Sequence, residues 1–229
     1  MVERSLLRIG AVSIILGVII FSVSGAFHGG HQPDDLVATL PQYATNANWI
    51  LVHLGQFLGL LLVIGGLVGL YRSITLGPGA ALAQLGFVAA VIGISSYAAN
   101  QAVDGIAIKF VAPEWVSAPP SEKEIAYRVA EAVRHIEIGL TSLTVLILGV
   151  AFILYGVAIE LSRVYPRWLG WLTVVGGGLW VVVSIFYAYW GFSPLAITIS
   201  QASGIFLVAW ALALAVLMWR RASTVSPSP

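Results

Sequence analysis

The sequence predicts an all-α, polytopic membrane protein built as a bundle of six transmembrane helices. Of its 229 residues, 59% are hydrophobic and only 9% are charged, and the mean hydropathy is +0.95. A water-soluble domain carries about 25% charged residues, so this chain has too few to cover a water-facing surface. The net charge of +1 gives no reason to expect nucleic acid. The absence of cysteine excludes disulfides and thiolate metal sites.

Six apolar stretches are long enough to cross a bilayer, which takes about 20 residues in a helix. They lie near residues 6–27, 49–71, 80–110, 125–160, 167–191 and 195–219. Backbone groups cannot remain unpaired in lipid, so these continuous apolar runs must be helices rather than the alternating strands of a barrel. We expect residues 1–221 to form a single transmembrane domain and residues 222–229 to be a disordered tail.

The positions of the arginines predict the orientation of the bundle. Seven of them flank the ends of the spans: Arg4, Arg8, Arg72, Arg163, Arg167, Arg220 and Arg221. If six spans alternate, all of these lie on one side, and the positive-inside rule makes that side cytoplasmic. Both termini are therefore expected in the cytoplasm, in a plasma membrane of the bacterial inner-membrane type. The first span also resembles a signal peptide that ends at Ser24-Gly25-Ala26, but its apolar run is at the long end for one.

Small residues recur every seven positions along five of the spans. The series are Gly10, Gly17 and Ser24; Gly59 and Gly66; Gly79, Gly86 and Gly93; Ser142, Gly149 and Gly156; and Gly170, Gly177 and Ser184. A seven-residue repeat keeps one stripe of a helix against a partner, and small residues let membrane helices approach closely. Extending two of the series reaches polar residues. We therefore expect Asn100, Asp104, Glu131 and His135 to face the bundle interior.

All four histidines of the chain are predicted to lie at the outer membrane boundary. His53 lies about 6 Å inside the start of the second span, at about 1.5 Å per residue, and Asp104 is at a similar level. His28 and His31 follow the first span directly. Ionisable groups inside membrane spans are costly and indicate function by default. Supporting polar residues at this level are Gln56, Asn100, Gln101, Glu131, Arg134 and Glu137.

These residues predict an outward-facing pocket that binds either a divalent metal ion or a single haem b. The candidate metal ligands are His28, His31, His53, His135 and Asp104. Three protein ligands and a water would form a site of the catalytic zinc type. For haem b, His53 and His135 would be the axial ligands on facing helices. No HExxH motif is present, and the sequence does not decide whether the protein is an enzyme.

Two other functions stay open. In the first, the protein is a non-enzymatic structural or accessory subunit, and its polar layer only fastens helices or a partner; Asp104 would then pair with Arg134 or Lys109. In the second, the protein transports a neutral solute. A proton-coupled carrier is disfavoured, because the deeper parts of the spans contain no carboxylate, His, Lys or Arg. The lipid bilayer is the expected partner, and a homo-oligomer or a membrane partner protein is left open.

The segment before the fourth span is expected to be a helix start outside the bilayer. Ser121 and Glu124 have the spacing of a capping box, and they follow Pro119 and Pro120. The connection from residue 28 to residue 48, which contains Asp34 and Asp35, is expected to be a polar outer segment without a span.

Overall fold

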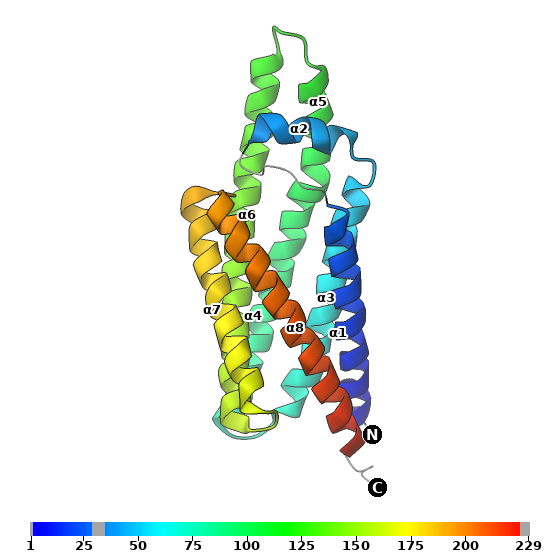
Figure 1. Cartoon of the computed structure of the whole chain (residues 1–229), viewed down its shortest axis with the longest axis vertical. Coiled ribbons are helices and arrows are strands. Elements are labelled where there is room, and N and C mark those ends of the chain that lie inside the picture. The colour runs from blue at the N-terminus through cyan, green and yellow to red at the C-terminus, as the bar shows by residue number, and fades with distance from the viewer. Residues whose placement is uncertain (1, 29–34, 225–229) are drawn as a thin grey trace.

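A computed structural model describes residues 2–28 and 35–224, and every regular element in these ranges is a helix (Figure 1). The elements are α1 (Val2–Ala26), α2 (Leu36–Thr45), α3 (Trp49–Ser73), α4 (Gly77–Gln101), η1 (Ala102–Ala107), α5 (Ile108–Ser117), α6 (Lys123–Ser162), α7 (Arg167–Trp190) and α8 (Pro194–Thr224). The segment η1 is a π-helix, and it joins α4 and α5 into one continuous rod.

Six helices are long and apolar enough to span a membrane, which confirms the predicted fold class. They are α1, α3, the rod formed by α4, η1 and α5, and then α6, α7 and α8. The described ends of the chain lie at the same end of the bundle (Figure 1). We call the opposite end the distal end. The assignment of the termini to the cytoplasm, and of the distal end to the outside, remains a prediction from the arginines.

Glycines on facing helices bring two helix pairs into backbone contact. A Cβ added at Gly17 of α1 would lie 2.5 Å from the Gly59 carbonyl oxygen of α3. The same relation joins α6 to α7, where a Cβ at Gly149 would lie 2.8 Å from the Gly177 carbonyl oxygen. Only glycine permits backbones to approach this closely. The stripe of small residues read from the sequence therefore faces neighbouring helices.

The outer connection expected between the first two spans contains a further helix, α2. The Asp35 carboxylate caps it by accepting a hydrogen bond of 3.0 Å from the Ala38 amide. The helix lies across the distal end of the bundle (Figure 1). Its buried residues Leu40 and Tyr43 pack in one cluster with Ile108 of α5, and that burial stabilises so short a helix.

Two expected helix ends differ from the structure. The helix α6 begins at Lys123 after Glu122, and no side chain caps it, so the predicted capping box of Ser121 and Glu124 is wrong. At the other end of the chain, α8 continues to Thr224 because Ala222 is fully buried in the core, so residues 222–224 are not a disordered tail. The rest of that tail, residues 225–229, lies outside the described residues.

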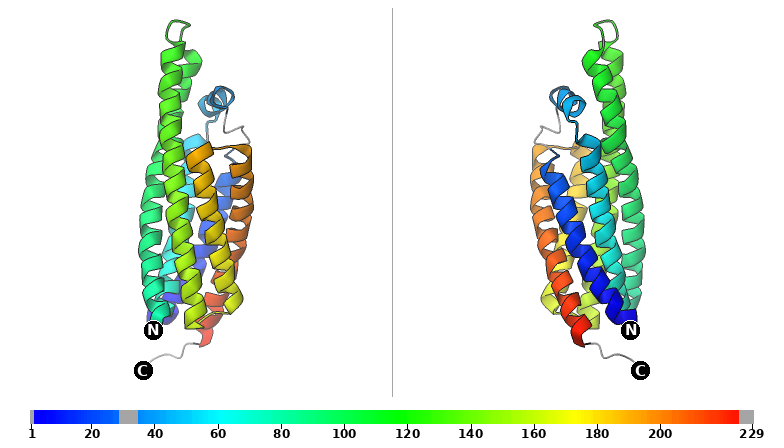
Figure 2. Two further views of the ribbon diagram at one scale, coloured as in Figure 1. Left: turned by 90° about the vertical axis from the view of Figure 1, so that its left-hand side faces the viewer. Right: turned by 90° about the vertical axis from the view of Figure 1, so that its right-hand side faces the viewer.

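Figure 2 shows α5 and the first turns of α6 extending beyond the other helices.

Replacing Gly59 by alanine is expected to destabilise the bundle, because the new Cβ would lie 2.7 Å from both the Gly17 carbonyl oxygen and the Phe21 amide nitrogen. Backbone atoms cannot move aside as a flexible side chain does, and overpacking of this kind costs about 1 to 3 kcal/mol. The measurement is the free energy of unfolding in mixed micelles. Gly65→Ala in the same helix is the control, since nothing lies within 4 Å of its added Cβ. Equal stability of the two variants would contradict the packing.

Candidate functional site

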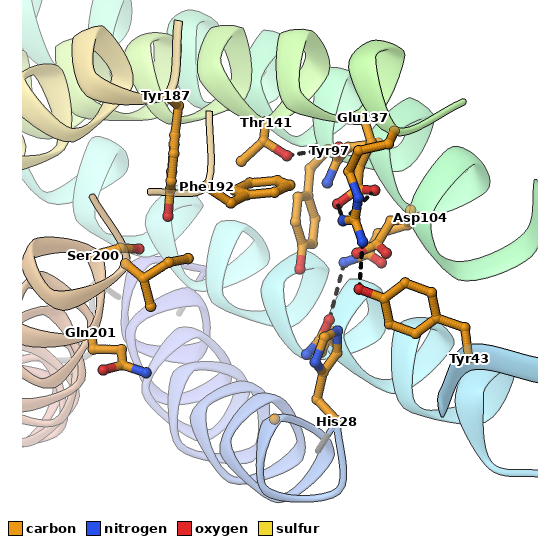
Figure 3. A pocket seen from close by; sticks show the side chains of 16 residues that line it. His28, Tyr43, Tyr97, Asp104, Glu137, Thr141, Tyr187, Phe192, Ser200 and Gln201 are labelled. Carbon is orange, nitrogen blue, oxygen red and sulfur yellow. Dashed lines mark hydrogen bonds and ion pairs between the residues drawn. The ribbon is translucent and has the colours of Figure 1, made fainter. Parts of the chain in front are cut away.

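A cavity of about 490 Å³ lies within the distal half of the bundle (Figure 3). Its lining comes from α1, α2, α3, α4, η1, α6, α7 and α8, together with the residues just beyond α1 and α7. Uncharged polar side chains form much of the wall: Gln56, Tyr97, Asn100, Gln101, Thr141 and Ser200. The charged residues among the described lining are Asp104, Arg134 and Glu137. A concave site with a few converging polar groups is the usual form of a ligand site.

His53 and Asp104 form a polar contact beside this cavity. The His53 Nε2 atom lies 3.0 Å from Asp104 Oδ2, and its Nδ1 lies 2.7 Å from the Trp49 carbonyl oxygen. A carbonyl oxygen only accepts, so the hydrogen of the ring belongs on Nδ1. In a neutral imidazole the Nε2 lone pair would then face a carboxylate. The two atoms must therefore share a proton or hold a cation between them.

The π-helical segment η1 and its glycine allow this contact. A Cβ added at Gly105 would collide with the His53 Cβ and would lie 2.7 Å from its Cγ, so only glycine leaves room for the ring. The Asp104 carbonyl oxygen accepts a hydrogen bond of 2.8 Å from the Trp49 indole Nε1. A π-turn interrupts the regular pairing of an α-helix, and such turns are frequent at functional sites. Trp49 thus holds both members of the pair in place.

His28 lies against the same group of residues. Its ring centroid is 4.9 Å from that of His53 and 4.7 Å from that of Trp49. One potential ligand atom from each of His28, His53 and Asp104 can be chosen so that all three lie within 4.8 Å of one another. The structure therefore brings together three of the five metal ligands predicted from the sequence.

His135 does not join this cluster, and the expectation that it and Glu131 face the bundle interior is wrong. His135 is exposed and lines a second cavity beside Trp190, while Glu131 pairs with the exposed Arg128 at 2.9 Å. The reason is that the stripe of small residues on α6 faces α7, as shown by the hydrogen bond of 2.9 Å from Ser142 Oγ to the Ser184 carbonyl oxygen. The helix α7 ends at Trp190, so the same face of α6 is uncovered at His135.

Of the remaining predicted site residues, five line the main cavity: Gln56, Asn100, Gln101, Arg134 and Glu137. Thr141 Oγ1 donates to Asn100 Oδ1 at 3.0 Å, and Gln101 Nε2 donates to Gln56 Oε1 at 3.3 Å. The other predicted ligand, His31, lies outside the described residues. Asn100 is buried and Asp104 partly buried, as expected from the glycine repeat on the third span.

Arg134 and Glu137 form a buried ion pair that includes a tyrosine from α2. Arg134 Nη1 donates to both carboxylate oxygens of Glu137 at 2.8 Å, and Nη2 donates to the Tyr43 hydroxyl. Burial raises the pKa of the Tyr43 hydroxyl above its usual value, although the nearby Arg134 opposes that effect. Tyr43 is therefore a neutral phenol at the distal end of the cavity. Tyr43 is not among the site residues predicted from the sequence, because α2 itself was not expected.

Lys109 fastens the end of α2 over the cavity. Its Nζ donates to the carbonyl oxygens of Tyr43, Ala44 and Asn46 at 2.9, 3.0 and 2.7 Å. The last carbonyl groups of a helix have no partner within the helix, and a cation there also interacts favourably with the helix dipole. Asp104 pairs with His53. The pairing with Lys109 or Arg134 that was expected for a structural or accessory subunit is therefore wrong.

The fold and the site together define a multi-pass α-helical membrane protein with a polar cavity at one end of its bundle. Comparison with models of protein families, with curated proteins and with solved structures finds no match for this chain. Its function must therefore be argued from its own residues.

Arg134→Met is expected to lower the free energy of unfolding by about 3 to 5 kcal/mol, because it leaves the buried Glu137 carboxylate without its partner. Adding Glu137→Gln should recover part of the loss, since the uncompensated charge is then removed. Arg128→Met is the matched control on the same helix: its ion pairs are exposed, and exposed pairs contribute little to stability. Unfolding in mixed micelles measures all three. A similar loss for Arg128→Met would contradict the assigned difference in burial.

Lys109→Met is expected to loosen α2, because three carbonyl oxygens at the end of that helix lose their donor. Amide hydrogen exchange should accelerate in residues 36–46 and remain slow in α3. Lys123→Met provides the control, since Lys123 donates instead to the Trp115 and Val116 carbonyl oxygens at the end of α5. Unchanged exchange in α2 of the Lys109 variant would show that apolar packing alone holds the helix.

Proposed function

We propose that this membrane protein binds a divalent transition-metal ion through His28, His53 and Asp104 at the edge of the distal cavity. Imidazole nitrogens and a carboxylate oxygen form a donor set that suits zinc. Three protein ligands leave one coordination position, and the adjoining cavity offers space there for water or a ligand. This open position is the form that catalytic zinc sites take.

The spacing of the ligand atoms supports the proposal. Tetrahedral zinc with bonds of about 2.0 to 2.1 Å holds its ligand atoms about 3.3 Å apart. The His53 Nε2 and Asp104 Oδ2 atoms are 3.0 Å apart, which is close to that value. The candidate atoms of all three residues lie within 4.8 Å, so His28 needs a shift of about 1.5 Å at most to complete the site.

The hydrogen bond from His53 Nδ1 to the Trp49 carbonyl oxygen is the observation that carries the proposal. Histidine ligands commonly donate their second ring N–H to a carbonyl or carboxylate, which fixes the tautomer and orients the ring. Here it leaves the Nε2 lone pair directed at Asp104 and at the space beside His28. A cation between Nε2 and the carboxylate would relieve the contact between two acceptors.

The haem b alternative lacks this support. A single haem would require His53 and His135 as axial ligands, but His53 is buried at the main cavity whereas His135 is exposed at the second one. A transporter of a neutral solute also lacks support, because the residues that line the main cavity belong to the distal halves of their helices.

The structural alternative is the second candidate, and the pairing of the buried charges favours it. His53 pairs with Asp104, and Arg134 pairs with Glu137 and Tyr43, so the same contacts can hold helices together without a cofactor. In that case a proton, rather than a metal ion, lies between His53 and Asp104. Direct measurement of bound metal separates the two candidates.

The test is zinc titration of the protein, purified in detergent and stripped with a chelator, followed by isothermal calorimetry and metal analysis. The wild type is expected to take up zinc at a single stoichiometric site. His53→Ala and Asp104→Asn should abolish that site, because each removes one of three ligands. His135→Ala is the matched control and should retain it, since His135 is exposed and away from the cluster.

Circular dichroism of each variant checks that the helices remain folded. A folded wild type that binds no zinc would overturn the proposal and favour the structural alternative. Loss of zinc in His135→Ala would place the site elsewhere. A Soret absorption band lost in both His53→Ala and His135→Ala would instead establish the haem pair.

A further inference from the structure

Two exposed residues mark the mouth of the distal cavity. Among the described residues that line the cavity, Gly25 of α1 and Gln201 of α8 are exposed. A residue that both lines a cavity and lies on the surface marks its opening. Both residues belong to membrane-spanning helices, so the opening lies between α1 and α8.

The course of α8 creates this opening. Near the chain termini α8 packs on α1: a Cβ added at Gly10 would lie 2.7 Å from Met218 Cε, and Arg8 lies over the Trp219 ring at 5.5 Å. The helix then crosses the bundle diagonally, so that its distal end lies near α7 and away from α1 (Figure 1). In Figure 3, Ser200 and Gln201 of α8 border one side of the cavity, opposite Asp104 and Glu137.

The surroundings of the mouth are apolar. Gln201 lies about 10 Å along α8 from its start at Pro194, at about 1.5 Å per residue. One helical turn closer to the termini, on the same faces of the two helices, lie the exposed side chains of Phe21 and Ile205. A molecule in the mouth would therefore have its outer part against apolar side chains and acyl chains.

The wall inside the mouth is polar, and its charged side chains neutralise one another. The charged side chains that line it are paired, Asp104 with His53 and Arg134 with Glu137. A charged head group would have no counter-charge there, which is costly in a site of low dielectric. Uncharged hydrogen-bonding side chains line the wall instead, among them Tyr97, Asn100 and Ser200. Hydroxyl and amide side chains both donate and accept hydrogen bonds.

We propose that the cavity binds an uncharged, single-chain lipid that enters from the bilayer between α1 and α8. Its head group carries hydroxyl or amide groups that hydrogen-bond to the inner wall, and its chain leaves past Phe21 and Ile205. A cavity of about 490 Å³ has the size that accommodates a drug-sized molecule, which fits a small head group and the first part of one chain. The inference concerns the cavity and its mouth, and it stands whether or not His28, His53 and Asp104 hold a metal ion.

The test uses a monoacylglycerol with a photoactivatable group near its head, incorporated with the purified protein into phosphatidylcholine vesicles. Labelled peptides are identified by mass spectrometry. Wild-type protein is expected to be labelled at the cavity wall, and excess unlabelled monoacylglycerol should compete. Gly25→Phe should reduce the labelling several-fold, because nothing lies within 4 Å of an added Cβ there and the ring can fill the mouth without disturbing the packing.

Gly139→Phe is the matched control, because its added Cβ is equally free and the residue does not line the cavity. It should leave the labelling unchanged. Equal labelling of the two variants, or competition by added phosphatidylcholine as strong as by monoacylglycerol, would overturn the proposal and indicate ordinary lipid contact. Stronger competition by a fatty acid anion would overturn the uncharged head group. Wild-type protein stripped of metal with a chelator should be labelled as strongly as zinc-loaded protein, so failure of the metal site and failure of the lipid site are distinguishable.

Discussion

The His53 ring lies directly against the backbone of the π-helical segment, and the chemistry of the site depends on that contact. Gly105 provides the space for the ring. Trp49 orients both partners, because its carbonyl oxygen accepts from His53 Nδ1 and its indole donates to the Asp104 carbonyl oxygen. The second ring nitrogen is thereby directed at the Asp104 carboxylate, 3.0 Å away. Two acceptors at that distance require a proton or a cation between them, which is why this pair, rather than any other polar group, suggests ligation.

The other charged groups at the distal end follow from the same physical constraint. Charges removed from water are costly unless they are paired and hydrogen-bonded, so Arg134 takes both oxygens of Glu137 and the Tyr43 hydroxyl. Lys109 meets the same requirement with the free carbonyl groups of α2. One consequence is mechanical: α2 is attached to the membrane-spanning helices through polar contacts, and through Tyr43 it forms part of the cavity wall.

Close helix packing and the cavity have a common origin. Glycine pairs hold α1 to α3 and α6 to α7 at backbone contact. The small-residue faces of these four helices are therefore already packed against each other. The helix α8 must bridge the two pairs, and it touches α1 near the termini and α7 along its distal part. The divergence between α1 and α8 leaves the space that the polar side chains line. A bundle with six parallel, evenly packed helices would have closed it.

Hydropathy and glycine spacing alone determined the six spans and the faces on which most of them pack, because both depend on local properties of the chain: the length of an apolar run and the period of a helix. Helix rise placed all four histidines and Asp104 at one level, and His28, His53 and Asp104 are neighbours in the structure. Only the tertiary structure decided that His135 is excluded, since that depends on where α7 ends beside α6. The helix α2 and the role of Tyr43 likewise required the assembled bundle, because ten residues that include Pro41 gain their stability from burial against other helices, not from their own periodicity.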